Sequence, residues 1–155
     1  MKCSLALTTL VGLSILVIDR FFKFIALALC QEPCEFTSFF SCSLSFNRGV
    51  SWGLFSTEHI YGTILLFCVI SSLIAFLTWL AYQRIRANQS AIAEVIIIAG
   101  ALGNLIDRLL YGAVVDFVSI HYQTWYFPTF NIADIAITVG VGILLMREWF
   151  VANAQ

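Results

Sequence analysis

Four long apolar stretches constrain the fold of this chain more than any other feature of its sequence. A helix needs about 20 mostly apolar residues to cross a hydrocarbon core about 30 Å thick. With 61% hydrophobic and only 11% charged residues, the chain is also far more apolar than a typical soluble domain. We therefore expect an all-α membrane protein that forms a single integral membrane domain over residues 1–155. Its transmembrane helices are predicted at about 4–29, 60–82, 91–110 and 132–150.

The polar segments between these stretches differ in character. Residues 30–58 carry Pro33, several serines, Gly49 and Gly53 between short aromatic and β-branched runs. This pattern predicts a small β-rich strand-and-turn element. Residues 111–131 are expected to form a short loop.

Basic residues indicate the orientation, because short cytoplasmic loops carry the excess of Lys and Arg. Four predicted spans then place both termini in the cytoplasm and both polar segments outside it. The first stretch is interpreted as a span and not as a cleaved secretory signal, since charged residues from 19 to 23 interrupt its apolar core. The basic residues that fall on the cytoplasmic side are Lys2, Arg84, Arg86 and Arg147.

Three of the five cysteines, Cys30, Cys34 and Cys42, fall in the segment 30–58. That segment could hold one disulfide, and the sequence leaves all three pairings open. The alternative is that the cysteines are free thiols that behave as small apolar residues.

Ionisable groups within membrane spans are costly and usually mark function. Asp19 and Lys23 are spaced i, i+4, so they share a helix face and can pair, either as a structural ion pair or beside a binding cleft. Asn104 and Arg108 lie one helical turn apart, with Asp107 beside them. They could hold an extended peptide through its backbone carbonyls, or form a buried network that locks two helices.

Asp116 and Asp134 give the sharpest chemical signal. They are 18 residues apart, and each lies beside a predicted outer boundary of an antiparallel span, so the two carboxyls can meet at one depth. Two carboxyls in contact tend to share one proton, which is the state that an aspartyl protease needs. The alternative is a solvated loop aspartate and a helix cap, because Asn131 and Asp134 also suit an N-cap and a first turn.

Four sequence blocks together resemble the bacterial lipoprotein signal peptidases, also called type II signal peptidases. They are DRFFK with Asp19 and Lys23, NRGVSWGLF from Asn47, GALGNLIDRLLYGAVVDFV and FPTFNIADIAITVG, in that order over nearly the whole chain. The resemblance implies an intramembrane aspartyl endopeptidase of the bacterial cytoplasmic (inner) membrane, with its active site near the extracytoplasmic face. Its reaction would remove the signal peptide from diacylglyceryl-modified prolipoproteins, without a metal or an organic cofactor.

The resemblance also implies roles for individual residues. Asp116 and Asp134 take the positions of the catalytic pair. The positions that bind substrate or support the pair fall on Asp19, Lys23, Asn47, Gly49, Asn104, Arg108 and Asn131. The chain departs from the family pattern N-x-G-A-A-F after Asn47, where it has Val50, Ser51 and Trp52.

The expected partners are lipid-modified prolipoproteins and membrane lipids, and we expect a monomer. A net charge of -1 and the lack of a basic run argue against nucleic acid.

Three other functions compete with the protease interpretation. GVSWG matches the nucleophile elbow of serine hydrolases, with Ser51 paired to His59 or His121, but four spans leave no room for the large sheet that this motif needs. A metalloprotease motif H-E-x-x-H does not occur. A small transporter or channel could use buried acids as a proton relay, yet the internal repeats of many transporters are not evident.

Overall fold

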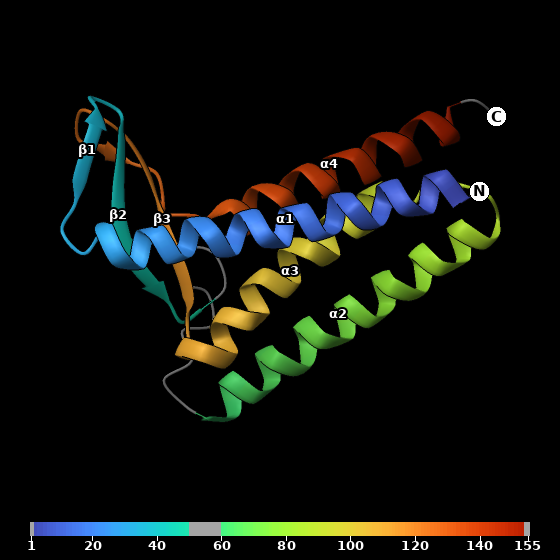
Figure 1. Ribbon diagram of the computed structural model, residues 1–155, viewed down its shortest axis with the longest axis horizontal. Helices are drawn as coiled ribbons and strands as arrows, with labels where there is room; N and C mark the ends of the chain where they lie inside the picture. The colour runs from blue at the N-terminus through green and yellow to red at the C-terminus, as the bar shows by residue number, and fades with distance from the viewer. Residues whose placement is uncertain (1, 50–59, 154–155) are drawn as a thin grey trace.

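Four long helices and a small antiparallel sheet make up the computed structural model, which describes residues 2–49 and 60–153. Each predicted apolar stretch forms a helix, as expected. In Figure 1 both termini lie at one end of the helices and the sheet lies at the other. The helices are α1 (Lys2–Leu29), α2 (Ile60–Arg86), α3 (Ile92–Tyr111) and α4 (Ile132–Ala152).

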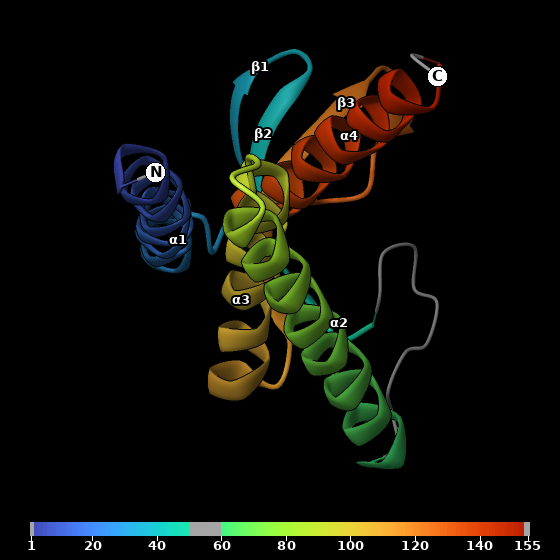
Figure 2. The same cartoon turned by 90° about the vertical axis from the view of Figure 1, so that its right-hand side faces the viewer.

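Glycines let α3 and α4 pack closely together. A Cβ atom on Gly100 would lie 2.5 Å from the carbonyl oxygen of Ala133, and one on Gly140 would lie 2.6 Å from Cγ1 of Ile97. Small residues at such positions allow helix backbones to approach each other. Helices α1 and α2 each pack on α3 as well. Helix α2 diverges from α1 and α4 in both views (Figures 1 and 2).

The sheet has the strand order β1-β2-β3-β4, with antiparallel neighbours throughout. Strands β1 (Cys34–Thr37) and β2 (Phe40–Asn47) confirm the β element expected within residues 30–58. The expectation of a loop over residues 111–131 was wrong, because β3 (Val114–Tyr122) and β4 (Trp125–Tyr126) lie there. The run VVDFVSIHY is rich in β-branched and aromatic residues, and β2 supplies the partner that such a strand needs.

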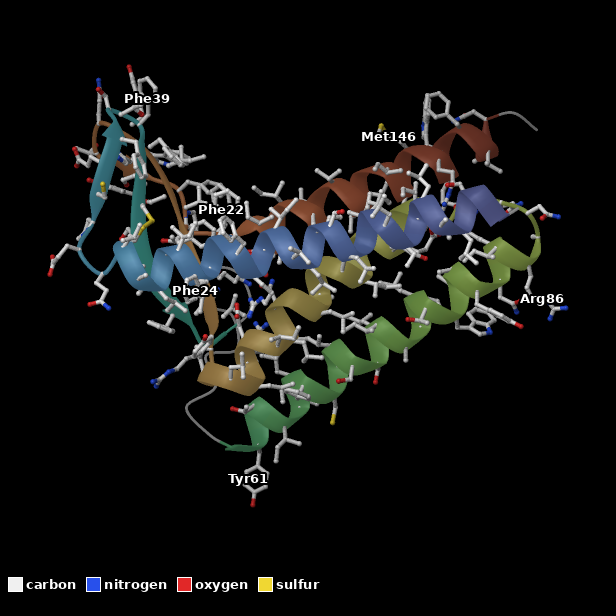
Figure 3. The ribbon with its side chains drawn as sticks, in the orientation of Figure 1. Phe22, Phe24, Phe39, Tyr61, Arg86 and Met146 are labelled. Carbon is white, nitrogen blue, oxygen red and sulfur yellow. A yellow bond between two sulfur atoms is a disulfide. The ribbon has the colours of Figure 1, made fainter. Side chains whose placement is uncertain are left out.

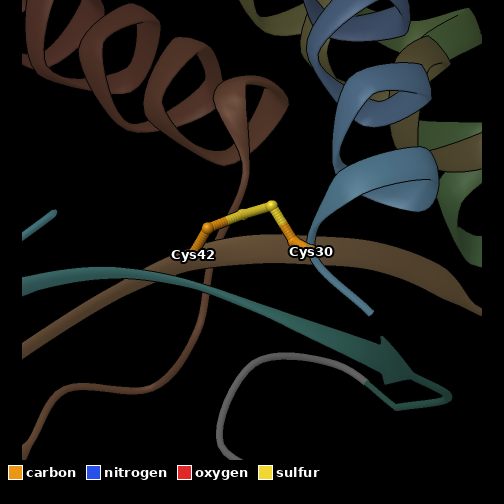
Figure 4. The surroundings of a disulfide bond; sticks show 2 residues. All are labelled: Cys30 and Cys42. Atoms are coloured by element: carbon orange, nitrogen blue, oxygen red, sulfur yellow. A yellow bond between two sulfur atoms is a disulfide. The ribbon is translucent and has the colours of Figure 1, made fainter. Parts of the chain in front are cut away.

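A disulfide between Cys30 and Cys42 joins the end of α1 to β2 (Figure 4). Of the three pairings left open by the sequence, this is the one that the structure contains. Cys34 is a free, exposed thiol, although it lies opposite Cys42 in the β1–β2 register. The bridge packs with Ala26 and Phe117, so it anchors the sheet on the end of α1.

Large apolar side chains cover the outside of the helices. Phe24, Tyr61 and Met146 point outward in Figure 3 and are 72%, 82% and 57% exposed. Within the described residues, two helices are long and apolar enough to cross a membrane, over Tyr61–Arg86 and Ile132–Ala152. An outward apolar surface of this kind suits contact with lipid.

Candidate active site

A β-bridge brings the two predicted catalytic aspartates into one region. Phe130, just before α4, pairs with Val118 of β3, and its N–H donates to the Val118 carbonyl oxygen at 3.0 Å. This pairing places the next residue, Asn131, beside Asp116 of β3. The Asn131 Nδ2 donates to Asp116 Oδ1 at 2.6 Å.

Asp134 belongs to the cap of α4 and to the same site. Asn131 is the N-cap of α4, and its Oδ1 accepts from the Asp134 N–H at 2.9 Å, while Asp134 Oδ2 accepts from the Asn131 N–H at 3.3 Å. This reciprocal capping box confirms the helix-cap interpretation. Asp134 Oδ1 also accepts from Nδ2 of Asn104 at 2.8 Å. Asp134 therefore caps its helix and remains connected to Asp116.

Two amides join the two carboxyls. Asn131 Nδ2, which bonds Asp116, also donates to Asn104 Oδ1 at 3.2 Å, and Asn104 in turn bonds Asp134. Asn131 is fully buried and Asn104 is 8% exposed, so water competes little for these bonds. We call this Asp116–Asn131–Asn104–Asp134 arrangement the carboxyl–amide chain. It fixes the orientation of both carboxyls.

Asn47, Gly49 and Arg108 support Asp116 from its other side. Asn47 Nδ2 donates to Asp116 Oδ2 at 3.2 Å. The Gly49 N–H holds Asn47 by donating to its Oδ1 at 3.0 Å, and Arg108 Nη2 holds Gly49 by donating to its carbonyl oxygen at 3.0 Å. Asn47 lies diagonally across the β2–β3 ladder from Asp116, because Ser45 pairs with Asp116 and Asn47 pairs with Val114.

Asp19 and Lys23 reach the site from α1. Lys23 Nζ lies 3.0 Å from Asp19 Oδ2, which confirms the predicted i, i+4 pair, and it donates to Asn104 Oδ1 at 3.0 Å. Asp19 Oδ1 accepts from the Ala133 N–H, in the first turn of α4, at 3.0 Å. The structure thus brings all nine residues singled out by the sequence into one connected network.

Arg20 and Asp107 also belong to this network, although the sequence predicted no partner for either residue. Arg20 Nη2 lies 2.5 Å from Asp107 Oδ1, and Lys23 Nζ lies 2.6 Å from Asp107 Oδ2. The signal for Arg20 was a charge inside an apolar stretch, next to Asp19. Its partner on α3 could not be identified without the packing of α1 against α3.

Burial, together with the nearby charge of Asp134, raises the pKa of Asp116 to about 6. Hydrogen bonds from Asn131 and Asn47 and the charge of Lys23 act in the opposite direction, but burial is the largest effect. A carboxyl with such a pKa can both hold and release a proton near neutral pH.

The competing interpretations concern a metal site and a serine nucleophile with a histidine partner. No group of three or more metal-ligating side chains occurs among the described residues. His121 stacks on Tyr126, with ring centroids 5.5 Å apart. Ser51 and His59, together with the departing positions Val50 and Trp52, lie outside the described residues.

Comparison with known proteins identifies the family. A family model described as signal peptidase (SPase) II matches residues 11–150. The chain belongs to the signal peptidase II family. Membership of this family makes it a peptidase.

Curated members of the signal peptidase II family support this assignment over most of the chain. The lipoprotein signal peptidase of Anaplasma phagocytophilum is 38% identical over 137 residues, which cover 86% of both chains. That of Polynucleobacter necessarius is 34% identical over 152 residues, which cover 94% of this chain and 92% of the relative. That of Blochmanniella pennsylvanica is 40% identical over 111 residues, which cover 71% and 67%.

Solved structures share the fold of this signal peptidase II member. One bacterial membrane enzyme aligns with a TM-score of 0.83 and 27% identity, over 97% of this chain and 92% of its own. A second aligns with a TM-score of 0.73 and 26% identity, over 92% of both chains. The mostly helical fold with a small antiparallel sheet is therefore that of a membrane enzyme.

Proposed function

We propose that this chain is an intramembrane aspartyl endopeptidase that removes the signal peptide from diacylglyceryl-modified prolipoproteins. The carboxyl–amide chain carries the proposal, because it orients Asp116 and Asp134 toward a shared region from two separate elements. Membership of the signal peptidase II family and the names of the relatives, lipoprotein signal peptidases, support the substrate class.

The proposed reaction uses one protonated and one ionised carboxyl. The ionised aspartate takes a proton from water while the water oxygen attacks the scissile carbonyl carbon. The protonated aspartate donates to the carbonyl oxygen. When the C–N bond breaks, the aspartate that took the water proton gives it to the nitrogen of the lipidated cysteine, and the other aspartate takes a proton back from a hydroxyl of the tetrahedral intermediate. These transfers leave a free amine, a new carboxyl group and one protonated aspartate. Asn131, Asn104 and Asn47 keep the two carboxyls oriented through their side-chain amides.

We further propose that all four helices cross the bacterial inner membrane as one domain. Both termini then lie in the cytoplasm, and the sheet and the site lie at the extracytoplasmic face. The arrangement in Figure 1 supports this proposal, since the termini and the sheet lie at opposite ends. Arg84 and Arg147, two of the basic residues used to infer orientation, meet at Glu94, at the end away from the sheet. We propose a monomer surrounded by membrane lipids.

The lipid on the substrate has a physical role in this mechanism. Acyl chains hold the modified cysteine at the membrane surface, so the scissile bond reaches the depth of the carboxyl pair. Holding a reacting bond in place in this way removes much of the entropic cost of reaching the transition state.

Mass analysis of the products tests the proposed function directly. Purified protein is incubated with a diacylated prolipoprotein and with the same precursor lacking the lipid. We expect a new amino terminus at the lipidated cysteine and little cleavage of the unmodified precursor. A different cleavage position, or no cleavage of the diacylated precursor, would contradict the proposal.

A further inference from the structure

Asp107 connects two elements that meet beside the proposed site. Its side chain is fully buried near the end of α3. Oδ1 lies 2.5 Å from Arg20 Nη2 of α1, and Oδ2 lies 2.6 Å from Lys23 Nζ of the same helix. Oδ2 also accepts from the backbone N–H of Val115 at 3.1 Å. One carboxylate therefore holds two cations of α1 and the start of β3 together.

The backbone held by Asp107 leads directly into Asp116. Val115 is the residue before Asp116 in β3, so the contact fixes the strand within about 3.3 Å of the Asp116 position along the chain. We propose that Asp107 is a positioning residue, whose carboxylate fixes Val115 and thereby sets where Asp116 lies relative to Asp134. This inference rests on the proposed function of the two aspartates.

A carboxylate is needed at this position for two reasons. Three donors converge on its two oxygens, so an amide, with a single oxygen, would leave at least one donor poorly bonded. Arg20 and Lys23 also carry two positive charges that Asp107 and Asp19 balance. Removing the charge of Asp107 leaves two cations, Arg20 and Lys23, with the single negative charge of Asp19. One positive charge is then uncompensated, which is destabilising in a buried site.

Replacing Asp107 by Asn tests this role, with Glu94→Gln as the matched control. Glu94 is another fully buried acid of α3 that holds two arginines, with its Oε1 at 2.8 Å from Arg84 Nε and 2.7 Å from Arg147 Nη2. It lies at the end of α3 away from the site. Both substitutions remove one buried negative charge, but only Asp107→Asn weakens a carboxylate that also accepts from the backbone of β3.

We expect Asp107→Asn to lower kcat on diacylated prolipoprotein by about tenfold or more while KM stays within about twofold, because small displacements of a reacting group are costly and Asp107 is too buried to touch substrate. Glu94→Gln should change kcat by less than about twofold, even where the two variants lose similar thermal stability. Both are assayed on folded, full-length protein. An unchanged kcat in Asp107→Asn, a rise in KM alone, or equal losses of kcat in both variants would overturn the inference.

Variants of Arg20 test the inference if Asp107→Asn does not fold. Arg20→Gln leaves Asp107 in contact with Lys23 but removes the guanidinium from Oδ1. We expect kcat to fall about threefold to tenfold with KM unchanged, and Arg20→Lys to restore most of it, since a lysine keeps the charge but loses the planar fork. A wild-type kcat in Arg20→Gln would overturn the inference.

If Asp116→Asn is inactive while Asp107→Asn remains fully active, the proposed function stands and only this inference fails. If the unchanged protein does not cleave the diacylated precursor, the proposed function itself fails.

Discussion

Asp116 is 2% exposed and ionises next to a second acid, so its protonation state depends on the folded structure. An ordinary carboxyl pKa of 3.8 rises to about 6 at this position. Between these two values the folded protein binds more protons than the unfolded chain, so the free energy of unfolding falls as pH rises through this window. Below this window Asp116 is protonated in both the folded and the unfolded state, so burial of the carboxyl does not lower the free energy of unfolding.

Asp116→Asn should remove this pH dependence. The difference between the two pKa values corresponds to about 3 kcal/mol, which is the upper limit of the stability that wild type loses relative to the variant between about pH 4 and about pH 7. Thermal unfolding of both proteins in detergent micelles across this range measures the difference. A difference between the proteins that stays constant with pH would show that burial does not perturb Asp116.

Residue types predicted most of the site because polar groups are conspicuous in apolar segments. Polar and charged groups within membrane spans have a high free-energy cost, which marked Asp19, Lys23, Asn104 and Arg108. Asn131 was marked by its suitability as a helix N-cap. Asp107 is also a charged residue in an apolar segment, but its partners could not be predicted. Its partners lie on α1 and β3, at sequence separations that no local pattern connects.

At the scale of elements, apolar length predicted the helices and could not predict how they pack. The α3–α4 contact depends on where glycines meet the facing backbone, which requires both helices in place. The run VVDFVSIHY has the β-branched and aromatic residues of a strand, but a strand forms only where a pairing partner is present. Its pairing partner, β2, lies more than sixty positions earlier in the chain.

Gly100→Ala and Gly142→Ala should affect stability in different directions. A Cβ at position 100 would lie 2.5 Å from a backbone oxygen of α4, whereas nothing lies within 4 Å of one at position 142. Overpacking of the first kind costs about 1–3 kcal/mol, while removing a helical glycine at an open position gains up to about 1 kcal/mol. Melting temperatures of the two variants measure the effect. Equal shifts would indicate that α3 and α4 do not meet as described.

At the scale of the whole molecule, helices with an exposed apolar surface enclose a polar network that lies next to a small sheet. The order of four sequence blocks was enough to indicate the family, and the match over residues 11–150 establishes it. The sequence could not show that a strand and a helix cap, rather than two helix ends, would bring Asp116 and Asp134 together. That convergence depends on the bridge between Val118 and Phe130, which forms only when the sheet is assembled.

The most direct test of the account is the kcat of Asp116→Asn and Asp134→Asn on diacylated prolipoprotein, with Ser51→Ala measured in parallel. If the two carboxyls share the chemistry, each Asn variant should lose at least about a thousandfold in kcat while remaining folded, because each carries a proton transfer that the other cannot replace. Ser51→Ala should keep most of its activity. Substantial cleavage by either Asn variant, or loss of cleavage only in Ser51→Ala, would contradict the two-aspartate mechanism.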